Sequence, residues 1–237
     1  FMEELCGVDP MRFAEYSCGY VTDLQFDVQA PDAPILFRGP GQAGHRLRIP
    51  ALECQAVSAR PLAGLTHPIY ERTPEHFYAA NNPPPGEPSG YGSVFLNQIG
   101  DGHVVYFSFD LFRFYQLDSY SPLRNIAVEM LDRVTPVQEV RVDAPAQVEV
   151  ILRQRAGSRF LHLINYANSR FGQGFHPVVL EDIVPVMGIP ARVRGVASSV
   201  IERPSGRPVQ FEYENDYTVF TIPRLDGHAI IELNMGD

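Results

Sequence analysis

A series of short segments separated by turn residues fills residues 147–233, and it constrains the fold more than any other feature. In Gln147–Gln154, Val148, Val150 and Leu152 alternate with their neighbours, the two-residue period of a strand with one buried face. The later segments are Arg159–Tyr166, Val178–Val186, Ala191–Arg203, Val209–Tyr213, Tyr217–Ile222 and Ala229–Leu233. Six or seven short strands at this spacing predict an antiparallel β-sandwich.

The turns between these segments are explicit in the sequence. They are Ala156-Gly157-Ser158, Pro204-Ser205-Gly206-Arg207, Glu214-Asn215-Asp216 and Asp226-Gly227. Gly, Asn, Asp and Pro dominate turns because they fit the required backbone angles. We therefore expect the chain to reverse direction at each of these places.

The first half gives a different pattern. From His45 onward it is extended, and Thr73–Gly92, which contains Asn81-Asn82-Pro83-Pro84-Pro85-Gly86, is predicted to be a surface loop, partly polyproline-like. Ser93–Ile99 and His103–Phe109 flank Gly100-Asp101-Gly102, a strong hairpin signal. The nearly continuous apolar run of the second segment predicts a strand buried on both faces.

A helix is predicted over Ser121–Val134. Ser121 can cap it, Pro122 suits its first turn, and Pro136 ends it. One apolar stripe runs along the helix, formed by Leu123, Ile126, Ala127, Met130, Leu131 and Val134. A buried strand followed by such a helix is typical of an α/β domain, so we place a domain boundary at about 136–140.

Composition excludes several functions. The net charge of −9 disfavours nucleic-acid binding, which needs clustered cations. All 19 basic residues are Arg, so neither Schiff-base chemistry nor a P-loop lysine is available. Without Trp, sugar stacking would depend on Tyr and Phe. Val104–Phe109 and the other apolar stretches are too short for a membrane span, and Phe1–Gly7 is no signal peptide, so we expect a cytoplasmic protein.

Two groups of residues in the first third of the chain are candidates for catalytic or metal sites. Cys18 resembles a nucleophile elbow only weakly, because bulky Tyr16 stands where Gly is expected and no helix follows. Cys6, Cys18 and Cys54 have no zinc or disulfide spacing, which favours buried thiols. His67, Glu71, Glu75 and His76 lie within ten residues, but Pro68 and Pro74 interrupt the helix that a metal site would require. We favour solvated loop residues there and expect no metal and no cofactor.

Further polar candidates lie next to predicted strands. Asp110 follows the apolar strand at its carboxyl end, where open α/β sheets bind ligands, and Arg113 is close to it. The interpretation that we prefer is that Asp110 caps the turn or pairs with Arg113. His162 and Asn165 lie on a sandwich strand, where adjacent strands can satisfy both. The weak candidates for binding are therefore His67, Glu71, His76, Asp110 and Arg113.

Two stretches together resemble a known family. Pro84-Pro85-Gly86-Glu87-Pro88-Ser89-Gly90-Tyr91 with Gly100–Leu111 is similar to the end of the amidotransferase-like trimerisation domain of bacterial β-galactosidase-type glycoside hydrolases. Ala144–Val150 with Leu161-His162-Leu163-Ile164-Asn165-Tyr166 resembles the C-terminal β domain that follows it. The resemblance covers roughly residues 60–235, in the same order.

The resemblance implies an organisation and a role. It implies a partial flavodoxin- or amidotransferase-like α/β domain over 1–137 and a β-sandwich over 138–237. In that family the catalytic carboxylates belong to an N-terminal barrel and the amidotransferase-like domain has no working Cys–His pair, so no catalytic residue carries over. We expect a non-catalytic accessory region that assembles with such a barrel, with itself in a homo-oligomer, or with carbohydrate. Two alternatives remain: a carbohydrate-binding module that uses Tyr and Phe, and an amidotransferase-like enzyme that uses Cys18.

Overall fold

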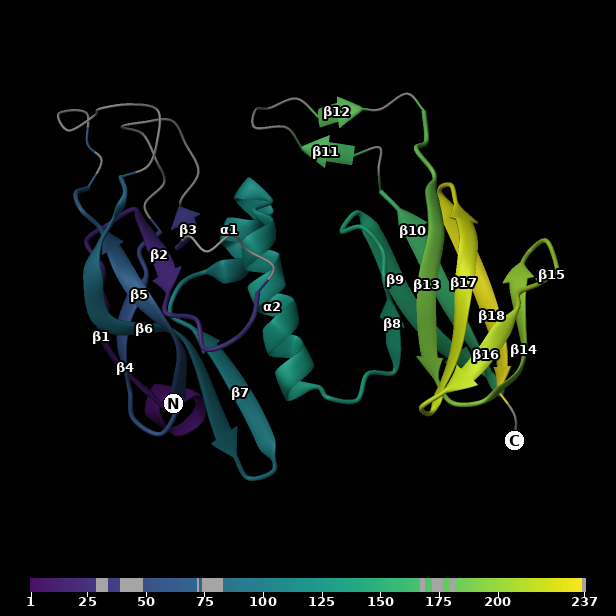
Figure 1. Cartoon of the computed structure of the whole chain (residues 1–237), viewed down its shortest axis with the longest axis horizontal. Helices are drawn as coiled ribbons and strands as arrows, with labels where there is room; N and C mark the ends of the chain where they lie inside the picture. Colours follow the sequence, from purple (N-terminus) through teal and green to yellow (C-terminus); the bar gives the residue numbers. More distant parts are fainter. Residues whose placement is uncertain are drawn as a thin grey trace. The chain divides into compact units, whose positions relative to one another are not determined.

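The computed structural model describes residues 1–28, 34–38, 49–71, 73, 83–166, 169–171, 177–179 and 182–235. The chain divides into two compact units, Phe1–Pro136 and Val137–Asp237 (Figure 1). Both are built mainly from antiparallel strands. No described helix has the length and apolarity needed to cross a membrane.

In its described residues the first unit contains one sheet with two α-helices packed on it. The described strands have the order β1-β4-β6-β5-β2-β3, and β7 pairs with β6. The elements are the π-helix η1 (Met2–Cys6), β1 (Val8–Phe13), β2 (Cys18–Thr22), β3 (Ile35–Arg38), β4 (Leu52–Ala56), β5 (Arg60–Pro68), β6 (Pro85–Ile99), β7 (Gly102–Phe107), α1 (Leu111–Asp118) and α2 (Ser121–Val134).

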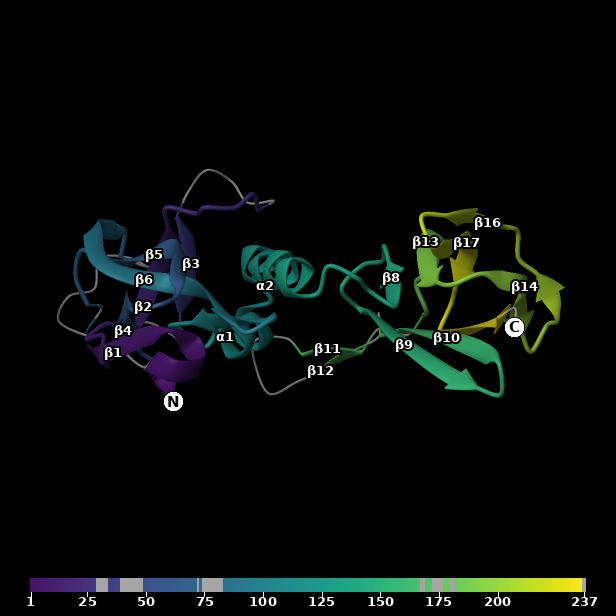
Figure 2. The same cartoon turned by 90° about the horizontal axis from the view of Figure 1, so that it is seen from below.

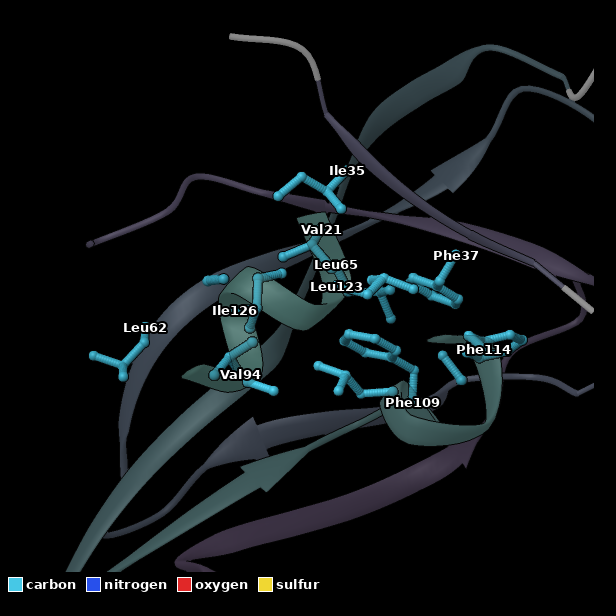
Figure 3. Close-up of a cluster of buried hydrophobic side chains, with 14 of the residues drawn as sticks. Val21, Ile35, Phe37, Leu62, Leu65, Val94, Phe109, Phe114, Leu123 and Ile126 are labelled. Atoms are coloured by element: carbon cyan, nitrogen blue, oxygen red, sulfur yellow. The ribbon is translucent and has the colours of Figure 1, made fainter. Parts of the chain in front are cut away.

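The core of this unit lies between the sheet and the two helices. Phe37 of β3 stacks on Phe109 with ring centroids 4.4 Å apart, and Phe114 of α1 packs beside them (Figure 3). Leu123 and Ile126 of α2 enter the same cluster. Of the apolar stripe expected along this helix, Leu123, Ile126, Ala127 and Met130 are buried and fix α2 on the sheet. The C-terminal end of the stripe does not follow this pattern, because Leu131 is 56% exposed and Val134 is half-buried.

The hairpin at Gly100-Asp101 is confirmed. Ile99 lies opposite Gly102, and Gly100 has a positive φ of 56°, which glycine adopts without steric cost. The expectation that the second strand is buried on both faces is wrong. Among the described strands β7 pairs only with β6, and its residues are exposed or half-buried. The surface loop predicted over Thr73–Gly92 is wrong from Pro85 onward, because β6 begins there; residues 74–82 lie outside the described part of the chain. Register shifts let β6 accommodate Pro85 and Pro88.

The α/β expectation for this unit is only partly met. Every described strand pair in its sheet is antiparallel, whereas a flavodoxin-like sheet is largely parallel, so that organisation is not confirmed. The helix over Ser121–Val134 is present, with Pro122 in its first turn. Ser121 is not its N-cap; the cap position is Tyr120, whose side chain makes no capping hydrogen bond.

The second unit is the antiparallel sandwich expected from the sequence. Its described sheets have the orders β15-β14-β18-β10-β9 and β16-β17-β13-β8, with β11-β12 as a separate pair (Figure 2). The strands are β8 (Val140–Val142), β9 (Val148–Arg155), β10 (Ser158–Asn165), β11 (Ser169–Phe171), β12 (Pro177–Val179), β13 (Val186–Arg194), β14 (Ala197–Arg203), β15 (Arg207–Pro208), β16 (Phe211–Glu214), β17 (Tyr217–Leu225) and β18 (His228–Met235).

The two larger sheets share one core. Leu161 and Leu163 of β10 and Leu233 of β18 belong to the same buried cluster as Val193 of β13 and Phe220 of β17. Because alternate residues of each strand face inward, each sheet buries one face against the other. The alternation in the sequence therefore identifies the inner face correctly.

Not all of the turns make hairpins. Ala156-Gly157 and Asn215-Asp216 have positive φ at both positions, as a two-residue type I′ hairpin requires. Asp226-Gly227 instead connects β17 to β18, which belong to different sheets. The segment expected over Ala191–Arg203 is likewise two strands, because the chain changes sheets at Gly195. The segment expected over Val178–Val186 is not one strand either, since β13 begins only at Val186.

Candidate functional site

A buried carboxylate in the first unit organises the most elaborate polar arrangement among the described residues. Glu53 of β4 has a side chain that is only 3% exposed. Its Oε2 accepts a hydrogen bond from Arg12 Nε at 2.7 Å, and its Oε1 lies 2.9 Å from His67 Nε2. An ionised carboxylate is stable in such a place only when it is paired. Arg12 and His67 supply that pairing, one to each oxygen.

Strand register explains how these residues meet. Arg12 of β1 lies directly opposite Glu53 of β4, and a register shift between Pro10 and Arg12 precedes this pair. A bulge of this kind re-aims a side chain, and here it lies next to the arginine that binds the carboxylate. His67 comes from the end of β5, so three strands contribute to the arrangement.

Two further contacts extend the arrangement to residues 16 and 17. The ring of Tyr16 stacks on that of His67, with centroids 5.0 Å apart and an interplanar angle of 28°. The Glu71 Oε2 atom accepts a hydrogen bond from the Ser17 backbone N at 2.8 Å. We call Arg12, Tyr16, Glu53, His67 and Glu71 the Glu53 cluster. The cluster links β1, β4 and β5 to the segment that follows β1.

The hydrogen-bond roles follow from the chemistry of the groups. An ionised carboxylate only accepts, so His67 Nε2 carries the hydrogen and donates it to Glu53. The hydrogen bond to Glu53 raises the pKa of the Arg12 guanidinium above its usual value, and the charge of Glu53 adds to this effect. Arg12 nevertheless keeps 66% of its side chain exposed, so its remaining N–H groups face solvent. The cluster can therefore donate hydrogen bonds at the surface.

The same geometry argues against Glu53 as a general base or a nucleophile. Both of its oxygens are occupied and its side chain is buried, whereas a catalytic carboxylate must reach the reacting atom. The role that this arrangement fits is to hold the arginine and the imidazole in place.

The sequence-based candidates are distributed over separate places. His67 stacks on Tyr16, and Glu71 accepts a hydrogen bond from the backbone of the next residue, Ser17. His76 lies outside the described residues, as does Glu75. Asp110 is the N-cap of α1 and its Oδ1 accepts a hydrogen bond from the Arg113 backbone N at 3.4 Å, which confirms the prediction that Asp110 caps the turn. No described contact joins Asp110 or Arg113 to the Glu53 cluster.

The cysteines do not form a catalytic or metal-binding arrangement in the described part of the chain. Cys18 begins β2, opposite Arg38 of β3, so it lies in an extended strand and not at a strand–turn–helix elbow. Cys6, Cys18 and Cys54 are buried, and none of the three is in a disulfide. Burial raises the pKa of the Cys54 thiol, which makes it less reactive. Among the described residues no group of three or more His, Cys, Asp or Glu could hold a metal ion.

His162 has its partner on an adjacent strand, as expected, whereas Asn165 is hydrogen-bonded to residues that lie between strands. His162 stacks on His228, with Nδ1 and Nε2 3.3 Å apart. Asn165 Nδ2 donates to the carbonyl oxygens of Val184 and Asp226. These contacts give both residues a structural role.

Sequence reasoning missed Glu53, Arg12 and Tyr16. The available signal was a carboxylate within the extended run Leu52–Ala59, next to residues that the fold buries. Its partners lie 41 residues before it and 14 residues after it along the chain. No local pattern specifies such pairs.

The structure is similar to parts of several solved sugar hydrolases. It matches α-L-fucosidase isoenzyme 2 from Paenibacillus thiaminolyticus with a TM-score of 0.76 and 17% identity, over 98% of this chain and 34% of that one. A cold-adapted β-galactosidase from Rahnella sp. R3 matches with a TM-score of 0.52 and 12% identity, over 99% of this chain and 25% of that one. Gan42B, a GH42 β-galactosidase, matches with a TM-score of 0.50 and 10% sequence identity, over 98% of this chain and 24% of that one.

These similarities establish the fold. The chain spans about a third of the length of the fucosidase and about a quarter of the length of the two galactosidases. No family model matches the sequence, and no curated protein matches it either.

Proposed function

We propose that this chain is a non-catalytic accessory region of a bacterial glycoside-hydrolase-like protein that acts in carbohydrate metabolism. The observation that carries the proposal is the match to the fucosidase, which includes 98% of this chain, and so both units, but only 34% of the enzyme. Unit 1 then corresponds to the amidotransferase-like trimerisation domain and unit 2 to the C-terminal β domain of the family named above. The catalytic carboxylates would lie on a separate barrel.

Within this proposal the Glu53 cluster helps to shape the mouth of the barrel's active site. Arg12 is exposed and fixed by a buried carboxylate, and Tyr16 and His67 are held beside it. Such preorganised donors and rings position a sugar without reacting with it. Both oxygens of Glu53 are already engaged, which supports a positioning role over a chemical one.

The first test assays this chain by itself. We expect no hydrolysis of 4-nitrophenyl α-L-fucoside or 4-nitrophenyl β-D-galactoside above the background rate. Hydrolysis by the chain that disappears in the Glu53→Gln or Cys18→Ala variant would contradict the proposal. If the rate is the same in the variants and falls on further purification, a contaminating enzyme explains it.

A second test places the region next to the proposed barrel. The reading frame around this segment is expected to encode a barrel with two carboxylates at strand ends. In that longer protein we expect Arg12→Gln to raise KM more than it lowers kcat, because Arg12 is proposed to position the sugar. Arg133→Gln is the matched control, since Arg133 pairs with Glu129 on α2. Equal kinetics for the two variants would refute the role of Arg12.

Assembly is the remaining part of the proposal. We expect the longer protein to form a homo-oligomer through this region, which light scattering after size-exclusion chromatography measures. The alternative of an amidotransferase that uses Cys18 is not supported, because Cys18 lies in the β2–β3 strand pair and not at a strand–turn–helix elbow. The carbohydrate-binding alternative has one specific observation in its favour, a groove in the sandwich.

A further inference from the structure

The sandwich has a groove of about 960 Å³ along one edge. This volume is at the upper end of the 300–1,000 Å³ range typical of ligand pockets. All of its lining residues belong to the second unit, and they come from the segment 207–212 and from β17. The groove is therefore a property of the sandwich alone.

The path of the chain between the two sheets creates this groove. β15 is an edge strand of the five-stranded sheet and β16 is an edge strand of the four-stranded sheet (Figure 1). Between them the chain crosses from one sheet to the other, anchored by the hydrogen bond from Val209 N to Val200 O at 2.9 Å. Val219, Thr221 and Pro223 of β17, which alternate with the buried residues of that strand, line the same groove.

The lining combines apolar surface with unused hydrogen-bonding groups. Pro208, Val219 and Pro223 provide the apolar part. Phe211 lies opposite the buried Phe220, so its side chain is on the other face of the β16–β17 pair. Gln210, Glu212 and Thr221 provide the polar part, and among the described residues none of these three side chains has a hydrogen-bond partner. The side chains supply an amide, a carboxylate and a hydroxyl, which together donate and accept.

The charges in the groove restrict the class of ligand. Arg207 Nη2 lies 2.6 Å from Glu202 Oε2, so its charge is already paired. The remaining charged group is Glu212, which disfavours an anionic ligand such as a phosphate or a uronic acid. An apolar face beside several donors and acceptors is complementary to a neutral sugar, which presents C–H groups on its faces and hydroxyls at its rim.

We propose that this groove binds a neutral oligosaccharide, with its rings over Val219 and the two prolines and its hydroxyls on Gln210, Glu212 and Thr221. The choice of a sugar rests on the proposed function, and the place and the contacts rest on the groove itself. The sandwich would then hold a polysaccharide chain independently of any catalytic barrel.

Isothermal titration calorimetry of the whole chain tests this proposal with β-1,4-galactotetraose, xylotetraose and L-fucose as separate probes. We expect at least one probe to bind. Glu212→Gln and Thr221→Val, both nearly isosteric, should each raise its Kd at least about 10-fold, the effect of losing one hydrogen bond to a ligand. Glu214→Gln is the matched control, because Glu214 is exposed on the same strand but does not line the groove.

Each result decides the question. Binding that is weakened by Glu212→Gln and Thr221→Val but not by Glu214→Gln supports the groove. Absence of heat with all three probes overturns it, and so do equal Kd values for the three variants. A negative result here leaves the KM test of Arg12 in the longer protein unaffected, so the two proposals fail separately.

Discussion

Replacing His67 by Phe tests whether the Glu53 carboxylate depends on its partners. Phe keeps a ring that can stack on Tyr16 but removes the Nε2 donor that lies 2.9 Å from Glu53 Oε1. Glu53 is 3% exposed, so water does not readily replace the lost hydrogen bond. Glu53 Oε1 would then be buried without its donor, and Arg12 would be the remaining partner of Glu53 in the cluster.

The magnitude follows from that burial. A hydrogen bond to a charged group contributes about 1.5–3 kcal/mol, and leaving a buried charged acceptor without its donor costs at least this much. For a unit of this size 1 kcal/mol corresponds to about 4 °C in Tm, so we expect unit 1 to melt about 6–12 °C earlier. A second substitution, Glu53→Gln in the His67→Phe background, should recover part of this loss because it removes the buried charge.

Differential scanning calorimetry at pH 7.5 measures the effect, with the transitions of the two units fitted separately. His103→Phe is the control, since His103 is exposed on β7 and the same change there should shift stability by no more than about 0.5 kcal/mol. If His67→Phe is no more destabilising than His103→Phe, Glu53 does not need the imidazole. If Glu53→Gln adds its own loss to that of His67→Phe, the two residues are not coupled, and the account of the cluster is refuted.

Three other predictions concern single residues. Gly7→Ala should destabilise unit 1 by about 1–3 kcal/mol in urea denaturation, because Gly7 has φ +68° and a Cβ there would lie 2.6 Å from Ala59 N; a neutral result would contradict this geometry. Asn165→Ala should cost unit 2 about 1–3 kcal/mol, since two backbone carbonyls lose their donor, and an unchanged Tm would show that water replaces it. The pKa of His162 is lowered by its burial and by the nearby charges of His228 and Arg153, so His162 binds a proton more tightly in the unfolded chain than in the folded one. Stability should therefore fall as the pH drops below about 6.5, and this part of the dependence should be absent in His162→Gln; parallel pH profiles would exclude it.

Much of the second unit follows from local sequence. Alternation identifies the inner faces of β9 and β10, and Asn215-Asp216 turns the chain where the sequence indicates. Local patterns cannot show whether consecutive strands pair. Asp226-Gly227 has the same composition as a hairpin turn, but it joins strands of different sheets. Whether such a turn joins two paired strands or two strands of different sheets depends on how the two sheets bury their inner faces against one another.

The first unit depends more on long-range contacts. The hairpin at Gly100-Asp101 and the apolar face of α2 are local features, and the sequence predicts both. The arrangement of the remaining strands differs from the α/β expectation because strands distant in the chain pair with one another, as β1 does with β4. The apolar run of β7 indicates a buried strand, yet in the described part of the sheet β7 pairs only with β6, and its residues are exposed or half-buried.

The sequence by itself therefore determines that the chain ends in a sandwich, that a helix precedes it, and that no local motif carries a known chemistry. Turn residues and hydrophobic periodicity depend on interactions between residues a few positions apart. A short segment of sequence is therefore enough to recognise them. Only the tertiary structure brings Arg12, Glu53 and His67 together from three strands, and only the crossing between two sheets creates the groove beside Val219. Both depend on strand register and on burial, which no single segment specifies.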